Sequence, residues 1–234
     1  MWSFNGAQTM AQLELNKDDQ IASGVQRAIF RHPFDKTKLV KVLKSADEMP
    51  QRSNFNGRMD QLLPSTRLRQ VRKEYQEYLR LMLKTEGREA RIPISHMMGF
   101  VSTNLGLGCL TESVTEADGT LGKTLGELAR SGSLKDEDLD LLNDAVSRIY
   151  RLNIRASDMN PKNFVLGHRW QGTALGPREC VLVDGFGDIH AIPIRSLSNW
   201  TNRLGLDDSC ARLARSAKLR WDKTNRAFTR RKES

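Results

Sequence analysis

The sequence predicts an α+β protein built in two lobes. Short apolar runs separated by turn residues fill positions 13–43, and the first strongly periodic helix comes only after them. Two more strand-like runs follow, and then a second long helix and a hairpin. Because strands dominate the first half and helices the second, we expect a sheet-containing N-lobe at 1–114 and a reduced C-lobe at 115–234, with a polar hinge near 112–119.

Composition indicates a globular protein of modest core. Hydrophobic residues make up 38% of the 234 residues and charged residues 28%, which is not polar enough for disorder throughout. No apolar run approaches the roughly 20 residues of a membrane helix, and the first residues do not have the pattern of a secretory signal. Cys109, Cys180 and Cys210 are odd in number and far apart. We therefore expect a cytoplasmic protein with reduced thiols and no membrane partner.

The N-lobe is predicted from two apolar runs and one helix. "QIASGVQRAIFRHP" and "KTKLVKVLK" are typical of strands, with a turn at 33–38 between them. "STRLRQVRKEYQEYLRLMLKTEG" has the periodicity of a helix, with Ser65 or Thr66 as its cap and Gly87 as its stop. The apolar stripe of this helix is predicted to be Leu68, Val71, Tyr75, Tyr78, Leu79 and Met82.

The rest of the chain is predicted to form strands, helices and a hairpin. "IPISHMMGFVST" and "LGCLTESV" favour strands, and "LGKTLGELAR" favours a short helix. "SLKDEDLDLLNDAVSRIYRLNI" is the second strong helix, with Ser133 and Asp136 as a capping-box start and Leu139, Leu142, Val146 and Ile149 on one face. "NFVL" and "CVLVD" then favour a β-hairpin whose loop is "GHRWQGTALGPRE".

The end of the chain is basic. Eight Lys and Arg stand against two Asp and Glu in the last twenty residues, which accounts for most of the net charge of +9. Two interpretations stay open: a solvated helix face or frayed terminus, and a contact with a phosphate or another anionic partner. No aromatic residues alternate with the basic ones in a stacking pattern, so we do not expect nucleic acid as a partner.

Three oxygen-bearing side chains are predicted to meet at one end of the hairpin. Asp158 and Asn163 come just before its first strand, and Asp184 comes just after its second. Paired strands lie about 5 Å apart, so the two ends should be close in space. Such oxygen ligands suit Mg²⁺, which takes one or two carboxylates together with substrate phosphates. The alternative is that Asp158 and Asn163 only form turns and that Asp184 caps the turn after it.

Three residues of the first half could complete a site. Lys41 lies inside an apolar strand, where an unpaired ammonium would be costly to bury. An exposed strand edge would explain it, and so would an ion pair with Glu74 on the border of the helix stripe. Gly24, between two strands, could let backbone N–H groups approach a phosphate.

The order of these residues resembles that of the protein-kinase-like fold. That pattern has a glycine loop, a strand-three lysine, a helix-C glutamate, a D-x-x-x-x-N catalytic loop and a metal-binding D-F-G. The matching loops here are "DMNPKN" and "DGFG". "CLTESVTEADGTLGKTLGELA" resembles strand five and the hinge, which implies that the backbone from Glu112 to Val114 holds adenine. The residues in order are Gly24, Lys41, Glu74, Asp158 with Asn163, and Asp184.

The closer resemblance is to the YrbL family of bacterial kinase-like proteins, named for the PhoP regulatory network. It extends from about Gly24 to Trp221 through "SGVQRAIFRHP", "LVKVLK", "RKEYQEY", "IPISHMMG", the catalytic loop and "VLVDGFGDIHAIPIRSLSNW". It implies a bilobal protein-kinase-like fold, with a small antiparallel-sheet N-lobe and a truncated, mainly helical C-lobe. It does not settle a substrate.

Kinase chemistry then implies a role for each site residue. Lys41 would hold the ATP phosphates and Glu74 would orient Lys41. Asn163 and Asp184 would bind Mg²⁺. Asp158 would accept or orient the proton of the attacking hydroxyl.

The sequence also departs from the kinase pattern. Ala22 and Arg27 stand where kinases have glycine, and Ala156–Ser157 stand where the catalytic loop has His-Arg. Only 47 residues follow Gly187, and they contain no A-P-E. We expect an ATP- and Mg-dependent kinase that acts on a hydroxyl of a small molecule or protein. The alternative is an inactive pseudokinase that serves as a regulatory nucleotide-binding or protein-interaction module.

Overall fold

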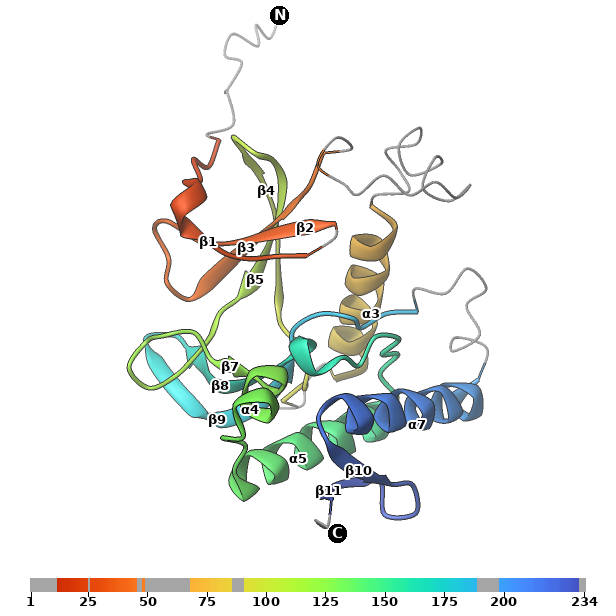
Figure 1. Cartoon of the computed structure of the whole chain (residues 1–234). Helices are drawn as coiled ribbons and strands as arrows, with labels where there is room; N and C mark the ends of the chain where they lie inside the picture. The colour runs from red at the N-terminus through yellow and green to blue at the C-terminus, as the bar shows by residue number, and fades with distance from the viewer. Residues whose placement is uncertain are drawn as a thin grey trace, which may run out of the picture. The chain divides into compact units, whose positions relative to one another are not determined.

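A computed structural model describes residues 12–24, 26–45, 48, 68–85, 91–188 and 198–231. The chain divides into two compact units, one from residues 1–67 and 98–111 and the other from residues 68–97 and 112–234. The predicted α+β class is confirmed, with an antiparallel sheet in the N-terminal unit and the helices in the second unit (Figure 1). The predicted lobe boundary at 114/115 stays a prediction.

The first unit is built on a five-stranded sheet in the order β1–β2–β3–β5–β4. The first three strands form consecutive antiparallel hairpins, as the apolar runs predicted. A short 3₁₀ turn, η1 (Lys17–Asp19), precedes them. The strands are β1 (Gln20–Ser23), β2 (Arg27–Arg31), β3 (Lys38–Leu43), β4 (Met97–Thr103) and β5 (Gly106–Glu112).

One face of this sheet forms an apolar core, and Lys41 lies on the other face. The core consists of Leu15, Ala28, Phe30, Val40 and Val42. Lys41 pairs with Ile29 in the ladder between Val40 and Val42, so its side chain points away from them. β3 lies between β2 and β5, and Lys41 is only 4% exposed. The exposed-edge explanation of Lys41 is therefore wrong.

Among its described residues, the second unit contains four α-helices. They are α3 (Arg69–Thr85), α4 (Leu125–Ser131), α5 (Asp136–Leu152) and α7 (Asn199–Ser216). α5 and α7 lie side by side (Figure 1), and the Tyr150 hydroxyl donates a hydrogen bond to Asp207 Oδ1 at 2.6 Å between them. The predicted apolar face of α5, Leu139 to Ile149, is buried.

Both long helices differ in detail from their predictions. α5 begins after Lys135, whose N–H donates to the Asp138 carboxylate at 2.9 Å, so the predicted Ser133–Asp136 cap is wrong. α3 buries Val71, Glu74, Glu77, Leu81 and Thr85, whereas Leu79 of the predicted stripe is 54% exposed. The buried face turned out to carry two carboxylates, which apolar periodicity alone does not register. The predicted caps of α3, Ser65 or Thr66 and Gly87, lie outside the described residues.

The hairpin in the second unit is longer than expected. β8 (Phe164–Gln171) pairs with β9 (Ala174–Leu182) through most of the predicted loop. The short strands β6 (Val114–Thr115) and β7 (Lys123–Thr124) extend this sheet on the other side of β8. The charged residues of this segment predicted a solvated loop instead of paired strands. In the structure, Arg169 is buried between the carboxylates of Glu112 and Glu179.

The basic end of the chain forms a hairpin, so the expectation of a solvated helix face or frayed terminus is wrong for residues 219–230. β10 (Leu219–Asp222) pairs with β11 (Ala227–Arg230). Phe228 is 1% exposed, and the Trp221 ring stacks on Tyr150 with centroids 6.3 Å apart. Asn143 of α5 holds β11 by two hydrogen bonds, accepting from Phe228 N–H at 2.7 Å and donating to its carbonyl at 3.1 Å.

Two further expectations concern the thiols and membranes. Cys109, Cys180 and Cys210 are buried free thiols, in agreement with the prediction. Within the described parts of the chain, none of the helices has the length and hydrophobicity that a membrane span requires.

The Asn143 contact predicts a specific loss of stability. Asn143→Ala should lower the free energy of unfolding by about 1–3 kcal/mol, because it leaves the Phe228 N–H and carbonyl without partners. Asp144→Ala on the same helix removes only an exposed ion pair with Arg148 and should cost about 0.5 kcal/mol or less. Urea unfolding of both variants checks this, and equal losses would contradict the role of Asn143.

Candidate functional site

The predicted site residues of the second unit do meet at one end of the β8–β9 hairpin. Phe164 pairs with Leu182, and the Val183 N–H donates to the Asn163 carbonyl at 2.8 Å, which closes the hairpin just before Asp184. Asn163 is the last residue of the 3₁₀ turn η2 (Pro161–Asn163). Its Nδ2 lies 3.0 Å from the Asp158 carbonyl and 3.4 Å from Asp158 Oδ2. The amide nitrogen of Asn163 thus faces Asp158, and its Oδ1 is the atom that could ligate a cation.

The two loops that carry these residues are tied together through their backbones. Asp158 N–H donates to the Gly185 carbonyl at 3.0 Å, and Gly187 N–H donates to the Arg155 carbonyl at 2.6 Å. The Ser157 hydroxyl adds a hydrogen bond of 2.8 Å to the Gly187 carbonyl, and Ser157 is buried. The segment that lacks the usual His-Arg pair therefore has a different support, supplied by Ser157 and by main-chain pairing.

Both glycines of "DGFG" are required by the geometry. Gly185 has φ +79°, and a Cβ there would overlap the Asp158 carbonyl oxygen. Gly187 has φ +94°, and a Cβ there would lie 2.7 Å from the Lys73 carbonyl oxygen on α3. Other residues adopt such φ values at a cost. The extra glycine relative to D-F-G thus lets the Asp184 loop pack directly on the catalytic loop.

Gln70 of α3 connects the helix to the Asp184 loop, and the sequence analysis did not identify it. Its Nε2 lies 3.1 Å from Glu74 Oε1 and 3.2 Å from Asp184 Oδ1. Asp184 Oδ1 also accepts the Gly185 N–H at 2.7 Å. The amide therefore fixes the orientation of the Asp184 carboxylate. Its position one helical turn before Glu74 was the available signal.

Glu77 is a second residue that the sequence did not identify, and it binds the segment that leads into the catalytic loop. It is 2% exposed and accepts hydrogen bonds from Arg155 N–H at 2.8 Å and from Arg80 Nη2 at 2.6 Å. Arg80 also donates to the Asn153 carbonyl at 3.0 Å. α3 is thereby fastened to the segment that leads into the catalytic loop. The sequence signal was a second glutamate three residues after Glu74, on the same helix face.

α7 supports the same segment from another direction. Asn202 is fully buried and donates hydrogen bonds to Asn153 Oδ1 at 2.9 Å and to the Ile154 carbonyl at 3.1 Å. Asn153 itself has φ +53°, a left-handed conformation that asparagine tolerates better than most residues. The turn before the catalytic loop is thus fixed by side chains of two helices.

The predicted adenine linker rests on a buried charged cluster. Glu112 accepts the His96 N–H at 2.8 Å and returns its own N–H to the His96 carbonyl at 3.1 Å. Arg169 Nε lies 3.4 Å from the Glu112 carboxylate, and Arg169 Nη2 donates to the Ile94 carbonyl at 2.7 Å. The Val114 carbonyl accepts the Gly122 N–H at 2.9 Å. Adenine binding by the linker stays a prediction. It would have to use backbone groups other than the Glu112 N–H and the Val114 carbonyl, which already form hydrogen bonds.

His96 in this cluster is held neutral. Burial lowers the pKa of the imidazole below its ordinary value, although the Glu112 carboxylate opposes the shift. Its Nδ1 lies 3.1 Å from the Tyr78 hydroxyl on α3, and burial raises the pKa of that phenol. The neutral pair therefore connects α3 to the linker by hydrogen bonding without adding a charge.

In the first unit, the glycine turn is closed by its own hydrogen bonds. Gly24 N–H donates to the Arg27 carbonyl at 2.8 Å, and Lys44 Nζ donates to the Gly24 carbonyl at 2.7 Å. A Cβ at Gly24 would have room, with its nearest neighbour 3.6 Å away. A phosphate contact of Gly24 stays a prediction. The pair of Lys41 and Glu74 would join the two units and also stays a prediction.

The residues present fit a Mg²⁺ ion held jointly by protein and substrate. Among the described residues, no three His, Cys, Asp or Glu side chains cluster as a self-sufficient metal site. Asp184 offers a half-buried carboxylate, and Asn163, whose Nδ2 faces Asp158, offers an amide oxygen. This oxygen-only set, completed by phosphates and water, is the coordination that Mg²⁺ accepts.

Comparisons with known proteins add a family and a distant structural likeness. The family described as "PhoP regulatory network protein YrbL" matches residues 13–218. No curated protein matches the chain. A solved kinase domain aligns with 14% identity and a TM-score of 0.40 over 70% of this chain. The alignment spans about half, 48%, of that kinase's chain, and so weak a likeness supports no functional argument.

A matched pair of glycine variants tests the loop packing. Gly185→Ala and Gly172→Ala both place alanine at positive φ, but only the first meets a backbone atom, because Gly172 has open space around it. Gly172→Ala should cost about 1 kcal/mol, whereas Gly185→Ala should cost at least about 2 kcal/mol more, as overpacking does. Thermal and urea unfolding check this, and equal costs would refute the contact with Asp158.

His96 predicts a component of acid sensitivity. Its folded pKa lies below the ordinary 6.5, so the unfolded chain binds more protons once the pH falls below that value. The stability contributed by neutral His96 is complete above about pH 6.5 and declines as the pH falls toward the lowered pKa. His96→Gln should therefore reduce the loss of stability between pH 7.5 and 5.5 in urea unfolding. An identical loss in the variant would contradict this.

Proposed function

We propose that this chain, which belongs to the family of the PhoP regulatory network protein YrbL, is a phosphotransferase that uses ATP and Mg²⁺ to phosphorylate a hydroxyl acceptor. The observation that supports it most strongly is the joined array of Asp158, Asn163 and Asp184, which hydrogen bonds hold at one hairpin end. Turn formation or capping alone would not require the two supports that α3 supplies, the half-buried Gln70 and the buried Glu77.

Asp158 is the residue suited to receive a proton. Its side chain is exposed, so an acceptor hydroxyl can approach its carboxylate from solvent. Its main chain is fixed by the bonds to Gly185 and Asn163. Phosphoryl transfer depends mainly on positioning and electrostatic stabilisation, so a fixed backbone beneath an accessible carboxylate suits this role.

Asp184 and Asn163 are the proposed metal ligands. Bound Mg²⁺ would neutralise charge on the transferred phosphate. Gln70 and the Gly185 N–H orient one carboxylate oxygen of Asp184, and Asn163 presents its amide oxygen because its nitrogen faces Asp158. Lys41 is proposed to hold the α- and β-phosphates of ATP and Glu74 to orient Lys41. Both side chains are buried, which suits charged groups with defined partners.

A regulatory pseudokinase is the second candidate. The Gly24 N–H is already donated to Arg27, which favours weak phosphate cradling. Such a module would bind nucleotide, or a protein partner, without turnover. A pseudokinase that binds nucleotide would share the nucleotide site with the phosphotransferase and would differ from it only in catalysis.

Binding of Mg²⁺-ATP is the first test. Isothermal titration should give a measurable affinity that falls at least tenfold in Asp184→Ala and in Lys41→Ala, because each removes a proposed phosphate or metal contact. Asp118→Ala, a change at an exposed loop aspartate, is the matched control and should bind like the wild type. If the wild type shows no affinity in the millimolar range, the phosphotransferase is wrong, and only a pseudokinase that binds a protein partner without nucleotide remains.

Turnover separates the two candidates. Asp158→Asn should keep Mg²⁺-ATP affinity within about twofold and lower the release or transfer of γ-phosphate by a factor of 10²–10⁴, the usual contribution of a positioned base. Wild-type turnover that persists in Asp158→Asn would refute the role of this residue. Tight nucleotide binding with no wild-type turnover would favour the pseudokinase.

A further inference from the structure

A small cavity lies beside the catalytic loop, bounded by α4 and the end of α7. Its volume is about 250 Å³. Gly126 packs against Pro161, where an added Cβ would lie 3.5 Å from the proline, so α4 fits closely on the loop. The residues that line the cavity are Gly126, Ala129, Arg130, Asn160, Pro161, Lys162, Ser216 and Lys218.

Every ionisable residue in the described lining of this cavity is a cation. Arg130, Lys162 and Lys218 come from three different segments, and no carboxylate of the described chain is part of the lining. The nearest acid along α4, Glu127, is engaged with Thr124, whose N–H and hydroxyl donate to it at 2.7 and 2.9 Å. Three cations around one hollow whose described lining contains no acid favour an anionic ligand.

Lys218 occupies a backbone conformation that a lysine rarely adopts. Its φ is +57°, and it directly follows Ala217, the residue that caps the end of α7. Glycine is the usual residue at this left-handed position after a helix, because it adopts that φ without strain. A lysine is attracted by the carbonyl end of the helix, which offsets part of the strain. The same conformation places a cation at the rim of the cavity.

The cavity has a fixed position relative to Asp158. Asp158 precedes Asn160 by two residues, so their Cα atoms are at most about 7 Å apart. The turn between them and Asn163 is rigid, because Asn160 Oδ1 accepts the Lys162 N–H at 3.1 Å and the Asn160 carbonyl accepts the Asn163 N–H at 2.8 Å. Asp158 is not part of the lining. A molecule with one group in the cavity could therefore present another group to Asp158.

We infer that this cavity binds a phosphate or carboxylate group of the acceptor whose hydroxyl reaches Asp158. The inference rests on the proposed phosphotransferase function and gives its acceptor a chemical class, a hydroxylated anion. A sugar phosphate and a serine next to acidic residues both have this chemistry. The volume suits one anionic group rather than a whole cofactor.

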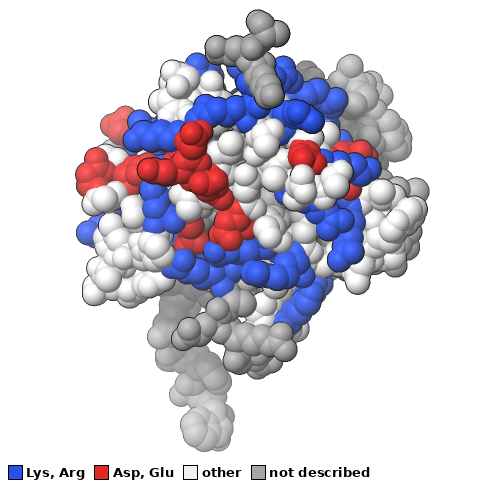
Figure 2. All heavy atoms as spheres, turned by 90° about the horizontal axis from the view of Figure 1, so that it is seen from below, with Lys and Arg blue, Asp and Glu red and all other residues white. Residues whose placement is uncertain are grey.

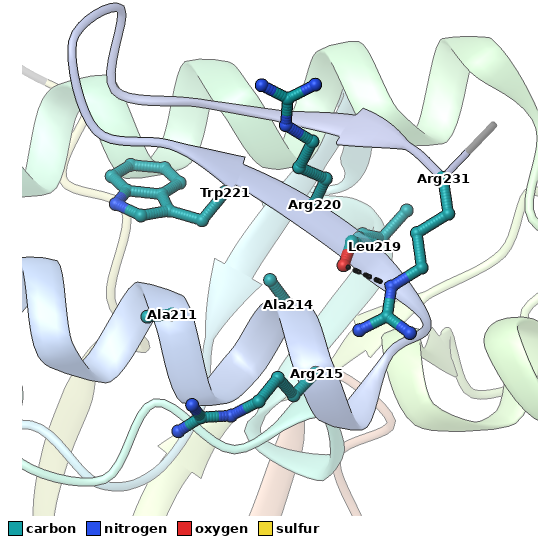
Figure 3. A pocket seen from close by; sticks show the side chains of 7 residues that line it. All are labelled: Ala211, Ala214, Arg215, Leu219, Arg220, Trp221 and Arg231. Atoms are coloured by element: carbon teal, nitrogen blue, oxygen red, sulfur yellow. Dashed lines mark hydrogen bonds between the residues drawn. The ribbon is translucent and has the colours of Figure 1, made fainter.

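A second basic cavity differs from this one in how its arginines lie. Its volume is about 460 Å³, and it lies between α7 and β10. In Figure 3, Arg215 and Arg220 point away from each other on opposite sides, and Arg231 donates its Nε to the Leu219 carbonyl at 3.2 Å. Basic side chains also gather in several groups on the face in Figure 2. Arg215 and Arg220 therefore provide control positions of equal charge.

Two probe pairs test the inference on the full chain by isothermal titration. One pair is glucose 6-phosphate and glucose. The other is a serine peptide with flanking aspartates and the same peptide with asparagines. At least one anionic probe should bind ten or more times more tightly than its neutral partner, and the pair that responds identifies a metabolite or an acidic segment as the source of the anion.

Paired variants locate the binding. Arg130→Gln/Lys218→Asn should weaken binding of the anionic probe at least tenfold, with asparagine chosen because it tolerates the positive φ. Arg215→Gln/Arg220→Gln loses the same charge and should change it less than twofold. Absence of binding by both anionic probes, or equal losses in both double variants, would overturn the inference.

Mg²⁺-ATP titration of the same variants separates this inference from the proposed function. Nucleotide affinity should be unchanged in Arg130→Gln/Lys218→Asn, since neither residue is assigned to the nucleotide. If the anion binds in the cavity but the wild type binds no nucleotide, the acceptor role is overturned together with the phosphotransferase. If nucleotide binds and the anionic probes do not, only the inference about the acceptor fails.

Discussion

The buried carboxylate of Glu77 is the constraint on which the site depends. A carboxylate in the protein interior is stable only when charged or N–H donors replace the water it has lost. Its donors here are Arg80 on the same helix and the Arg155 main chain, three residues before Asp158. Because the Glu77 carboxylate requires both partners, α3 and the segment that leads into the catalytic loop are held together. The bonds of Gln70 to Asp184 and the close approach of Gly187 to Lys73 depend on that arrangement.

The catalytic loop is supported by main-chain pairing where a histidine and an arginine were expected. Ala156 is fully buried and bridges to Phe186 and Gly187, and Ser157 reaches the Gly187 carbonyl. Small residues suit this arrangement, since the two loops could not come so close around larger side chains. The absent His-Arg pair is therefore not by itself a sign of a collapsed site. The loop is held by main-chain pairing and by Ser157 instead of by long charged side chains.

Periodicity and turn chemistry predicted the order of the elements, because both patterns can be seen in short stretches of sequence. They also predicted that Asp158, Asn163 and Asp184 meet, because a hairpin brings its two ends together. The contacts that support them were not predictable, because their partners lie 78 residues apart for Glu77 and Arg155 and 114 for Gln70 and Asp184. The burial of Arg169 was not predictable for the same reason, since its neutralising carboxylates come from other strands. The final hairpin was missed because its apolar anchors, Trp221 and Phe228, stand among many charges and pack on α5.

The double engagement of Gln70 has a consequence for communication within the second unit. A ligand that draws on Asp184 Oδ1 competes with the Gln70 amide for one oxygen atom, so its binding free energy includes the change in that hydrogen bond. Thermodynamic reciprocity then requires that a partner or substitution that shifts α3 alters the affinity at Asp184, and that the ligand alters the stability of α3 by the same amount. Changes at α3 can therefore regulate ligand affinity at Asp184, in addition to the support that the helix gives to the site.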